Sequence, residues 1–312
     1  MSKKVSLKNN WLDFLIIFLV LILNLFWLPT FSYWKTYPQN RFLTKNNQLL
    51  EFQSPDTPVI KFTKKPVLAT NNYILIDVAT NKILTSKNMD QKIYPASTTK
   101  LATAITALNL YPLDEIITVD QTYDTGKVME LELNEKITVK SLVQSLLVYS
   151  ANDAAYTLAK HYQGGLSGFI AQMNLLMSKY NLTNTHFVNV DGIHNDDHYS
   201  TVYDLSQLGR LAIKNQTVTS VVKNKSLIVT DISGNIKHEI ISTNELLGVI
   251  PEIIGLKTGW TPEAKGCFIG LISIDGHEVI SVVANSDDRF QDTKILLNWL
   301  KKNVFWQSTP KT

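Results

Sequence analysis

Cysteine is almost absent from this chain of 312 residues, in which Cys267 is the single example. One cysteine excludes an intrachain disulfide and a cysteine-based metal cluster. A strong charge of either sign is lacking too, because the net charge is +3 and lysines alternate with acidic residues beyond the N-terminus. Nucleic-acid binders concentrate basic residues on one face, so we expect no nucleic-acid partner.

A polar loop could suggest a metal site. His194 and His198 lie there together with Asp196 and Asp197. Imidazole and carboxylate groups can bind metals, but loops rich in Asn, Asp and His are typical of ordinary turns. We therefore expect neither a metal nor another cofactor.

One long apolar run is present, WLDFLIIFLVLILNLFWL at residues 11–28. Its length suffices to cross a bilayer, and Lys3, Lys4 and Lys8 precede it, which predicts a cytoplasmic N-terminus. A cleaved signal peptide is the alternative, but the bulky residues that follow contain no Ala-x-Ala pattern. We expect a single-pass transmembrane anchor in the lipid bilayer of the cell membrane, with the rest of the chain outside the cytoplasm.

The rest of the chain divides by composition and periodicity. Residues 1–10 are the expected cytoplasmic tail. Residues 29–70 contain prolines among Asn, Gln, Lys and Thr with little periodicity, which predicts an extended extracytoplasmic spacer. A folded domain is predicted over residues 71–305, followed by a tail at 306–312.

Hydrophobic patterns predict strands at both ends of this domain and helices between them. The predicted strands are 73–77, 82–86, a hairpin within 226–241, 253–259, 266–274 and 277–284; the predicted helices are 97–110, 139–148, one from about 153, 166–180, one after Thr201 and a last one carrying Ile295, Leu296 and Trp299. This order indicates an α+β fold, in which one antiparallel sheet is closed by distant segments and flanked by helices, with a helical lobe inserted.

The sequence PASTTK at residues 95–100 precedes an apolar helical pattern. Pro95 can begin a helix but cannot continue one backwards. Ser97 and Lys100 are then one turn apart on the same face, where a hydroxyl and an amine make a nucleophile with its own base. The alternative is that Ser97 only caps the helix and that Lys100 is a solvated surface lysine.

Two further motifs follow in a fitting context. Ser150-Ala-Asn152 lies at a predicted bend between two helices, and Lys257-Thr-Gly259 lies on a predicted strand. A competing set is Ser220-x-x-Lys223 with Ser233-Gly-Asn235. The first of these falls in a β-branched run that starts a helix poorly, and the second is explained by a hairpin turn, so we set both aside.

The three motifs in this order resemble the signature of the penicillin-interacting serine enzymes, which include class A β-lactamases and penicillin-binding proteins. From about Tyr73 to Leu300 the chain is similar to the serine D-alanyl-D-alanine carboxypeptidases, the low-molecular-mass penicillin-binding proteins, in the blocks IYPASTTKLATAITAL, LLVYSANDAAYTLA, DGIHNDDHYSTVYDL, STNELLG and IIGLKTGWTPEAKGCFIG. The resemblance implies a β-lactamase/penicillin-binding-protein-like fold. It also implies removal of the terminal D-Ala from peptidoglycan stem pentapeptides that end in D-Ala-D-Ala, and covalent binding of β-lactam antibiotics. Many members carry a C-terminal β-rich domain and a C-terminal membrane-binding helix beyond the blocks matched here.

The resemblance also implies roles for the first motif. Ser97 would attack the carbonyl between the two terminal D-alanines, and Lys100 would take its proton. A lysine at its ordinary pKa of about 10.4 is a poor base, so the site must lower that pKa by roughly three units. We expect two causes, namely the positive end of the lysine's own helix and the nearby ammonium of Lys257.

For the other residues the implied roles are proton transfer and binding. Ser150 would relay a proton to the departing D-alanine, and Asn152 would hydrogen-bond Lys100 and the substrate amide. The backbone N–H groups of Ser97 and Trp260 would hold the oxyanion. The candidate substrate-binding residues are Lys257, Thr258, Gly259, Trp260 and Arg289, of which Lys257, Thr258 and Arg289 would hold the terminal carboxylate.

Two side chains near this site have an alternative without a catalytic role. Arg289 is one of three arginines and could form a surface ion pair with Asp287 or Asp292. Cys267 is predicted to be a core residue.

Three alternative functions remain open. A β-lactamase would need a deacylating base such as a glutamate, and no glutamate occurs between Leu166 and Asp204. A catalytically silent membrane receptor for cell-wall peptides or β-lactams would need no nucleophile. A transpeptidase, in which an amine replaces water as the acceptor, has the same motifs.

Overall fold

A five-stranded antiparallel sheet joins segments from both ends of the described chain. The computed structural model describes residues 55–61 and 64–308. The strands lie in the order β3 (Ile83–Lys87), β2 (Asn72–Asp77), β10 (His277–Ser286), β9 (Lys265–Ile274) and β8 (Ile253–Thr261). Because β2 pairs with β10, the predicted closure of one sheet by distant segments is confirmed.

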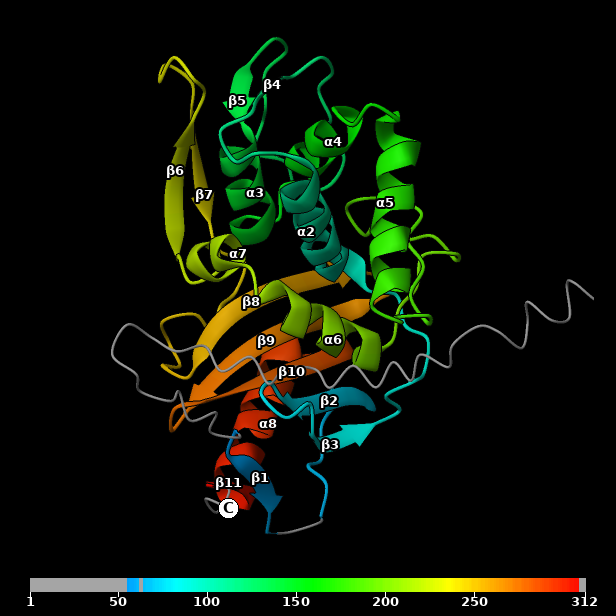
Figure 1. Ribbon diagram of the computed structural model, residues 1–312, viewed down its shortest axis with the longest axis vertical. Helices are drawn as coiled ribbons and strands as arrows, with labels where there is room; N and C mark the ends of the chain where they lie inside the picture. Colours follow the sequence, from blue (N-terminus) through cyan, green and yellow to red (C-terminus); the bar gives the residue numbers. More distant parts are fainter. Residues whose placement is uncertain (1–54, 62–63, 309–312) are drawn as a thin grey trace, which may run out of the picture. The chain divides into compact units, whose positions relative to one another are not determined.

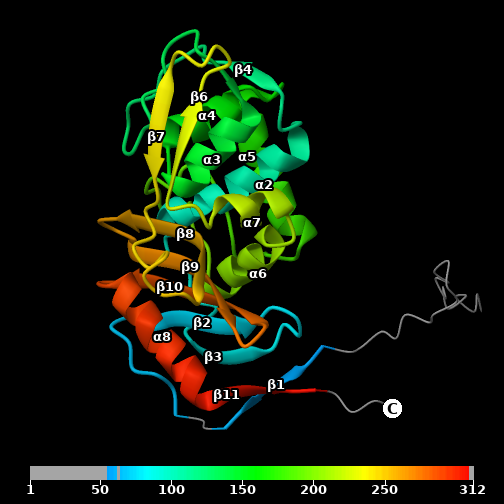
Figure 2. The same ribbon diagram turned by 90° about the vertical axis from the view of Figure 1, so that its left-hand side faces the viewer.

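A helical lobe is inserted between β3 and β8 and lies on one side of the sheet (Figure 1). It contains α2 (Lys100–Leu110), α3 (Val139–Val148), α4 (Asn152–Lys160), α5 (Gly165–Lys179), α6 (Val202–Ala212) and α7 (Gln216–Val221), with the hairpins β4 (Ile116–Thr118)–β5 (Lys136–Thr138) and β6 (Ser226–Thr230)–β7 (Lys237–Ile241). Figure 2 shows α8 (Arg289–Asn303) against the opposite face of the sheet.

Alternation along the strands explains these two layers. On β2, Ile74 and Ile76 pack into the core cluster that includes the lobe helices, whereas Tyr73 and Leu75 pack into the cluster that includes α8. Side chains of a strand point to opposite faces in turn. Both faces of this sheet are therefore buried, which is why the strand reads as a continuous apolar run.

The start of the predicted helix 97–110 differs from a regular α-helix. Ala96–Thr99 form a 3-10 turn, η1, and the α-helix α2 begins at Lys100. Ala96 has a positive φ of 47°, so the chain enters the turn in a conformation that hydrophobic periodicity does not reveal. Ser97 and Lys100 remain three residues apart across the junction.

The β-branched run around Ser220 is helical, contrary to the prediction. Residues 216–221 form the short helix α7, because the Asn215 side chain accepts hydrogen bonds from the N–H groups of Thr217 and Val218 at its start. Ser220 is nevertheless exposed, and its hydroxyl donates to the carbonyl of Thr217 at 2.8 Å. These two observations exclude Ser220 as the nucleophile, although the secondary structure expected around it was wrong.

One strand pair was not predicted from the sequence. β1 (Thr57–Ile60) pairs with β11 (Val304–Gln307) directly after α8. Within the range predicted as a spacer, residues 57–60 are thus tied to the end of the domain. The apolar run at 11–28 lies outside the described residues, and among the described residues no helix is long and apolar enough to cross a membrane.

Candidate active site

Strand β8 presses against the η1 turn that carries Ser97. A Cβ atom placed on Gly259 would lie 2.8 Å from the Ser97 nitrogen and 3.0 Å from the Thr98 nitrogen. Real Cβ atoms do not approach so closely, so only glycine lets the strand come this near. The Lys257-Thr-Gly259 motif is therefore brought directly beside the predicted nucleophile.

The side chains of Ser97 and Lys100 meet at this point. Lys100 Nζ lies 2.9 Å from Ser97 Oγ and donates to the Asp191 carbonyl at 2.7 Å. The Ser97 hydroxyl also donates to the Asp191 carbonyl, at 3.3 Å. A separation of 2.9 Å is within reach of direct proton transfer. The alternatives of a mere cap and a solvated lysine are wrong, because Lys100 is fully buried and Ser97 caps no helix.

Burial is the main reason that Lys100 can act as a base. It lowers the pKa of the amine to about 8, while the carboxylates of Asp191 and Asp153 oppose the shift. The predicted direction is confirmed, but the two predicted causes are not the leading ones. A sequence pattern places a lysine on a helix face without revealing that the face is covered.

Lys257 is the second buried lysine of the site, with an exposed fraction of 1%. Its Nζ donates to the carbonyl of Thr258 at 2.9 Å. Burial lowers its pKa well below the ordinary value, and the positive charges of Lys100, Lys127 and Arg289 lower it further. The predicted repulsion between Lys100 and Lys257 thus lowers the pKa of Lys257.

The Ser150-Ala-Asn152 motif forms the predicted bend between α3 and α4. Ser150 has a φ of 70°, and Asn152 is the first residue of α4. The Asn152 side chain donates to the Thr125 carbonyl at 2.8 Å. The hydrogen bond predicted between Asn152 and Lys100 is not among the contacts of the described residues.

The remaining substrate-binding candidates differ in exposure. The Thr258 hydroxyl is 2.5 Å from that of Thr243, within the fold. The Trp260 side chain is 59% exposed, at the end of β8. The role predicted for Trp260 concerns its backbone N–H and does not require its ring, which is open to solvent.

Arg289 is the first residue of α8, and its predicted surface ion pair is absent. Asp287 pairs instead with Lys265 at 2.9 Å, and the Asp292 carboxylate accepts from the N–H groups of Ala69 and Thr70. Arg289 has no ion pair among the described residues, and its buried Nε lacks a hydrogen-bond partner there. The alternative with Asp287 or Asp292 is wrong, and the guanidinium is available for an anion.

Asp191 and Gly192 lie against the candidate site, and the sequence motifs did not identify them. The Asp191 carbonyl contacts both Ser97 and Lys100. A Cβ on Gly192, where φ is +83°, would lie 1.8 Å from the Ala96 carbonyl oxygen. Because the acting atom is a main-chain carbonyl, no residue type at position 191 reveals it, and only the positive-φ glycine that follows is a sequence signal.

His198 does not take part in a metal site. Its Nδ1 accepts from the Val188 N–H at 3.1 Å, so its Nε2 donates to the Thr99 hydroxyl at 2.8 Å. Thr99 in turn donates to the Ala96 carbonyl at 2.8 Å. Burial lowers the pKa of His198 to about 3, so the ring is neutral at pH 7. This neutral ring stabilises the η1 turn through its hydrogen bond to Thr99. Among the described residues no group of three His, Cys, Asp or Glu side chains could hold a metal.

Cys267 is a core residue, as predicted. It is fully buried, and burial raises the pKa of its thiol to about 11. Its Sγ lies 3.5 Å from the carbonyl of Tyr94. A thiol with a raised pKa is a poor nucleophile at neutral pH, so Ser97 has no competitor at Cys267.

Known sequences match this chain over most of the described domain. A sequence profile of a family described as D-alanyl-D-alanine carboxypeptidase matches residues 60–288. The D-alanyl-D-alanine carboxypeptidase of Streptomyces sp. (strain K15) is 33% identical in an alignment of 264 residues, which covers 78% of this chain and 90% of that protein. DacF of Bacillus subtilis is 28% identical over 67% of this chain and 56% of its own length, and DacD of Escherichia coli is 30% identical over 76% and 64%. The chain thus spans less than two thirds of the latter two relatives.

Solved structures share the fold. The crystal structure of the Streptomyces K15 DD-transpeptidase superposes with a TM-score of 0.72 at 32% identity, covering 76% of this chain and 98% of that one. A penicillin-binding protein homolog from Mycobacterium tuberculosis gives a TM-score of 0.72 at 25% identity, covering 77% and 94%. The predicted α+β fold of the β-lactamase and penicillin-binding-protein type is confirmed.

Proposed function

Since the chain belongs to the D-alanyl-D-alanine carboxypeptidase family of serine hydrolases, we propose that it removes the terminal D-alanine from peptidoglycan stem peptides through an acyl-enzyme at Ser97. One observation carries the proposal. A buried lysine, with its pKa lowered to about 8, lies 2.9 Å from the serine hydroxyl. A solvated lysine at the ordinary pKa would hold its proton and could not accept one from serine.

The proposed reaction gives each of these groups one role. Ser97 Oγ attacks the carbonyl between the two D-alanines while its proton passes to Lys100 Nζ. The amide C–N bond then breaks, and the proton reaches the departing D-alanine amine by way of the Ser150 hydroxyl. Water hydrolyses the resulting ester and frees Ser97. The main-chain N–H groups of Ser97 and Trp260 stabilise the oxyanion of each tetrahedral intermediate.

Binding of the substrate carboxylate is assigned to Lys257, Thr258 and Arg289. The positive charges of Lys100 and Arg289 lower the pKa of Lys257, so this corner of the site is electropositive. A bound carboxylate would offset that repulsion and favour the charged form of Lys257. β-Lactam antibiotics, which carry a carboxylate next to a reactive amide, are expected to bind in the same way and to acylate Ser97.

Arg289→Ala is predicted to reduce kcat/KM for peptides ending in D-Ala-D-Ala. The loss should correspond to roughly 2–3 kcal/mol of transition-state stabilisation, the size of a hydrogen bond to a charged group. The matched control is Arg210→Ala, since Arg210 is bound to the Val78 carbonyl on the sheet and to Asn81. Peptide turnover is measured by the D-alanine released. Equal turnover by the folded Arg289 variant and the control would rule out the carboxylate role.

Transpeptidation is a second candidate because the Streptomyces K15 relative is described both as a carboxypeptidase and as a DD-transpeptidase. The two activities share one acyl-enzyme and differ in whether water or an amine accepts the acyl group. Incubation with a D-Ala-D-Ala peptide and a glycine-type amine separates them, since transfer yields a new amide product and hydrolysis does not.

We also propose that residues 11–28 anchor the chain in the cell membrane with the domain outside the cytoplasm. Support comes from the length of the apolar run and the lysines before it. Protease added to intact cells or spheroplasts is expected to degrade the domain, as followed by an antibody. Survival of the domain until detergent opens the membrane would place it in the cytoplasm instead.

A further inference from the structure

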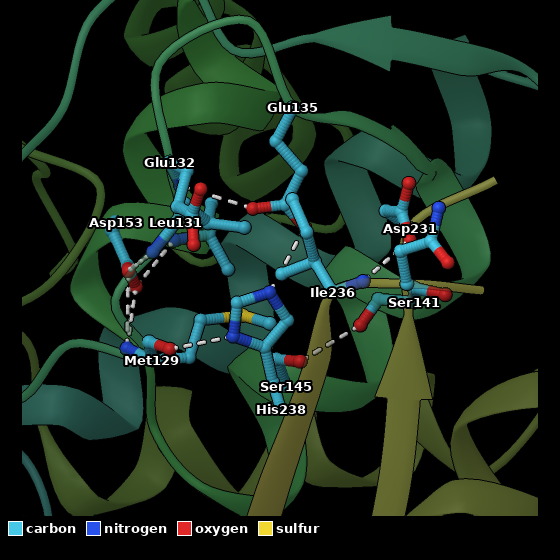
Figure 3. A network of polar contacts seen from close by, with 12 residues as sticks. Met129, Leu131, Glu132, Glu135, Ser141, Ser145, Asp153, Asp231, Ile236 and His238 are labelled. Carbon is cyan, nitrogen blue, oxygen red and sulfur yellow. Dashed lines mark hydrogen bonds and ion pairs between the residues drawn. The ribbon is translucent and has the colours of Figure 1, made fainter. Parts of the chain in front are cut away.

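A buried histidine and glutamate form a pair outside the catalytic residues. His238 on β7 and Glu135 just before β5 are 7% and 3% exposed. His238 Nε2 lies 2.9 Å from the Glu135 carboxylate, and its Nδ1 lies 2.8 Å from the Met129 carbonyl (Figure 3). A carboxylate and a carbonyl both accept hydrogen bonds. Both contacts are therefore satisfied when each ring nitrogen carries a proton.

The pair fixes one end of a segment that covers the start of α4. This segment, residues 125–135, is called the strap below. The Asn152 side chain and N–H donate to the strap carbonyls of Thr125 and Lys127, at 2.8 and 2.7 Å. A Cβ on Gly126 would lie 2.5 Å from the Asn152 side-chain nitrogen. The position of the Asn152 amide is thus set by the strap.

Met129 connects the two ends of this arrangement. Its N–H and that of Leu131 donate to the Asp153 carboxylate at 3.0 and 3.1 Å, while its carbonyl accepts from His238 (Figure 3). Asp153 directly follows Asn152 at the start of α4. The same residue of the strap is therefore held by the histidine on one side and by the active-site helix on the other.

We propose that His238 is a positioning residue, whose doubly protonated ring, fixed by Glu135, holds the strap in the conformation that orients Asn152 for acylation of Ser97. The proposal rests on the proposed function, since acylation is the step it serves. His238 touches neither the substrate nor the reacting atoms. It acts through Met129 and the strap carbonyls.

This arrangement has a definite dependence on pH. The hydrogen bond to Glu135 raises the pKa of His238 above its ordinary value of 6.5, against the opposing effect of burial, and Asp153 is the other carboxylate that favours the charged ring. A raised pKa means that the stabilising contribution is complete below 6.5 and is lost as the pH rises through the pKa of the folded protein. Lys100 acts in the opposite direction, because the neutral amine it needs as a base forms as the pH rises through about 8.

The test compares rates of acylation by benzylpenicillin for the full chain and for His238→Gln between about pH 6 and 9.5. The ratio of the two rates removes the dependence on Lys100, which both proteins share. We expect a ratio of about ten at low pH, where only the wild type has the charged ring, and a ratio near one at high pH. A second variant, Glu135→Gln, should behave in the same way.

The matched control is a second histidine–glutamate pair, which lies at the C-terminal end of α4. His161 follows α4, and its Nε2 lies 2.6 Å from Glu115, but both side chains are about one third exposed. His161→Gln should give a ratio near one at every pH. For His238→Gln, a ratio of acylation rates that does not change with pH would show that His238 only packs against its neighbours. That result would overturn the proposal.

Hydrogen exchange provides a readout that needs neither a variant nor catalysis. In the unliganded wild type, protection of the Met129, Leu131 and Asn152 amides should fall as His238 loses its proton, after correction for the intrinsic exchange rate. Titration of the His238 ring by NMR gives the midpoint for comparison. Constant protection through that midpoint would overturn the role of His238, whereas absence of any penicillin adduct would contradict the proposed function instead.

Discussion

Ser97→Ala is expected to abolish both covalent labelling by benzylpenicillin and release of D-alanine, because Ser97 is the serine whose hydroxyl lies beside the buried amine of Lys100. Lys100→Ala should slow acylation by about a thousandfold, within the range ascribed to a general base. The serine would then lack the amine that lies 2.9 Å from its hydroxyl. Mass spectrometry of the peptide containing residue 97 should find the whole drug attached in the wild type and no adduct in Ser97→Ala.

The chain supplies its own matched control for this experiment. Ser220 and Lys223 have the same spacing, but Ser220 is exposed and donates to Thr217. Ser220→Ala and Lys223→Ala should label and turn over peptide as the wild type does. A drug adduct on Ser220, or saturable binding without any adduct, would contradict the assignment of Ser97.

The lifetime of the adduct distinguishes this enzyme from a β-lactamase. No glutamate occurs between Leu166 and Asp204 to activate a deacylating water. The penicilloyl ester should therefore outlast the acyl-enzyme formed from a D-Ala-D-Ala peptide by a wide margin. Rapid loss of the penicilloyl group would favour hydrolysis of the drug.

The sequence was sufficient to predict those parts of the site that depend on residue type and short spacing. Ser97 and Lys100 lie one turn apart in the chain itself, and the Lys257-Thr-Gly259 motif requires only that its strand reach them. The strand patterns also predicted the sheet, because both of its faces are buried and the runs are strongly apolar. In these cases local pattern and final position agree.

Features that depend on long-range contact could not be predicted in this way. Burial rather than helix position is the main cause of the lowered pKa of Lys100, and burial belongs to the whole fold. The Asn152 side chain donates to the Thr125 carbonyl, a contact that the sequence does not reveal because any residue could supply this main-chain atom. Tertiary contact also explains why β1 was not predicted, because this short strand forms only by pairing with β11, far along the chain.

Gly192→Ala is expected to lower the free energy of unfolding by roughly 3–5 kcal/mol and to slow acylation about a hundredfold. At φ +83° an alanine is strained by about 1–2 kcal/mol. Its Cβ would also lie 1.8 Å from the Ala96 carbonyl oxygen, so either η1 or the loop must move. Such a movement would weaken the 2.7 Å hydrogen bond from Lys100 to the Asp191 carbonyl, at a further cost of about 1–3 kcal/mol.

Gly234→Ala separates the strain of this backbone conformation from the overlap at Gly192. Gly234 has a similar φ of +74° in the turn between β6 and β7, but a Cβ there would meet nothing within 4 Å. Its substitution should therefore cost only about 1–2 kcal/mol in urea unfolding and leave acylation unchanged. Equal losses of unfolding free energy in the two variants would show that the overlap of the residue 192 Cβ with the Ala96 carbonyl is relieved without cost. Normal acylation by Gly192→Ala would mean that Ser97 and Lys100 do not depend on the position of the Asp191 carbonyl.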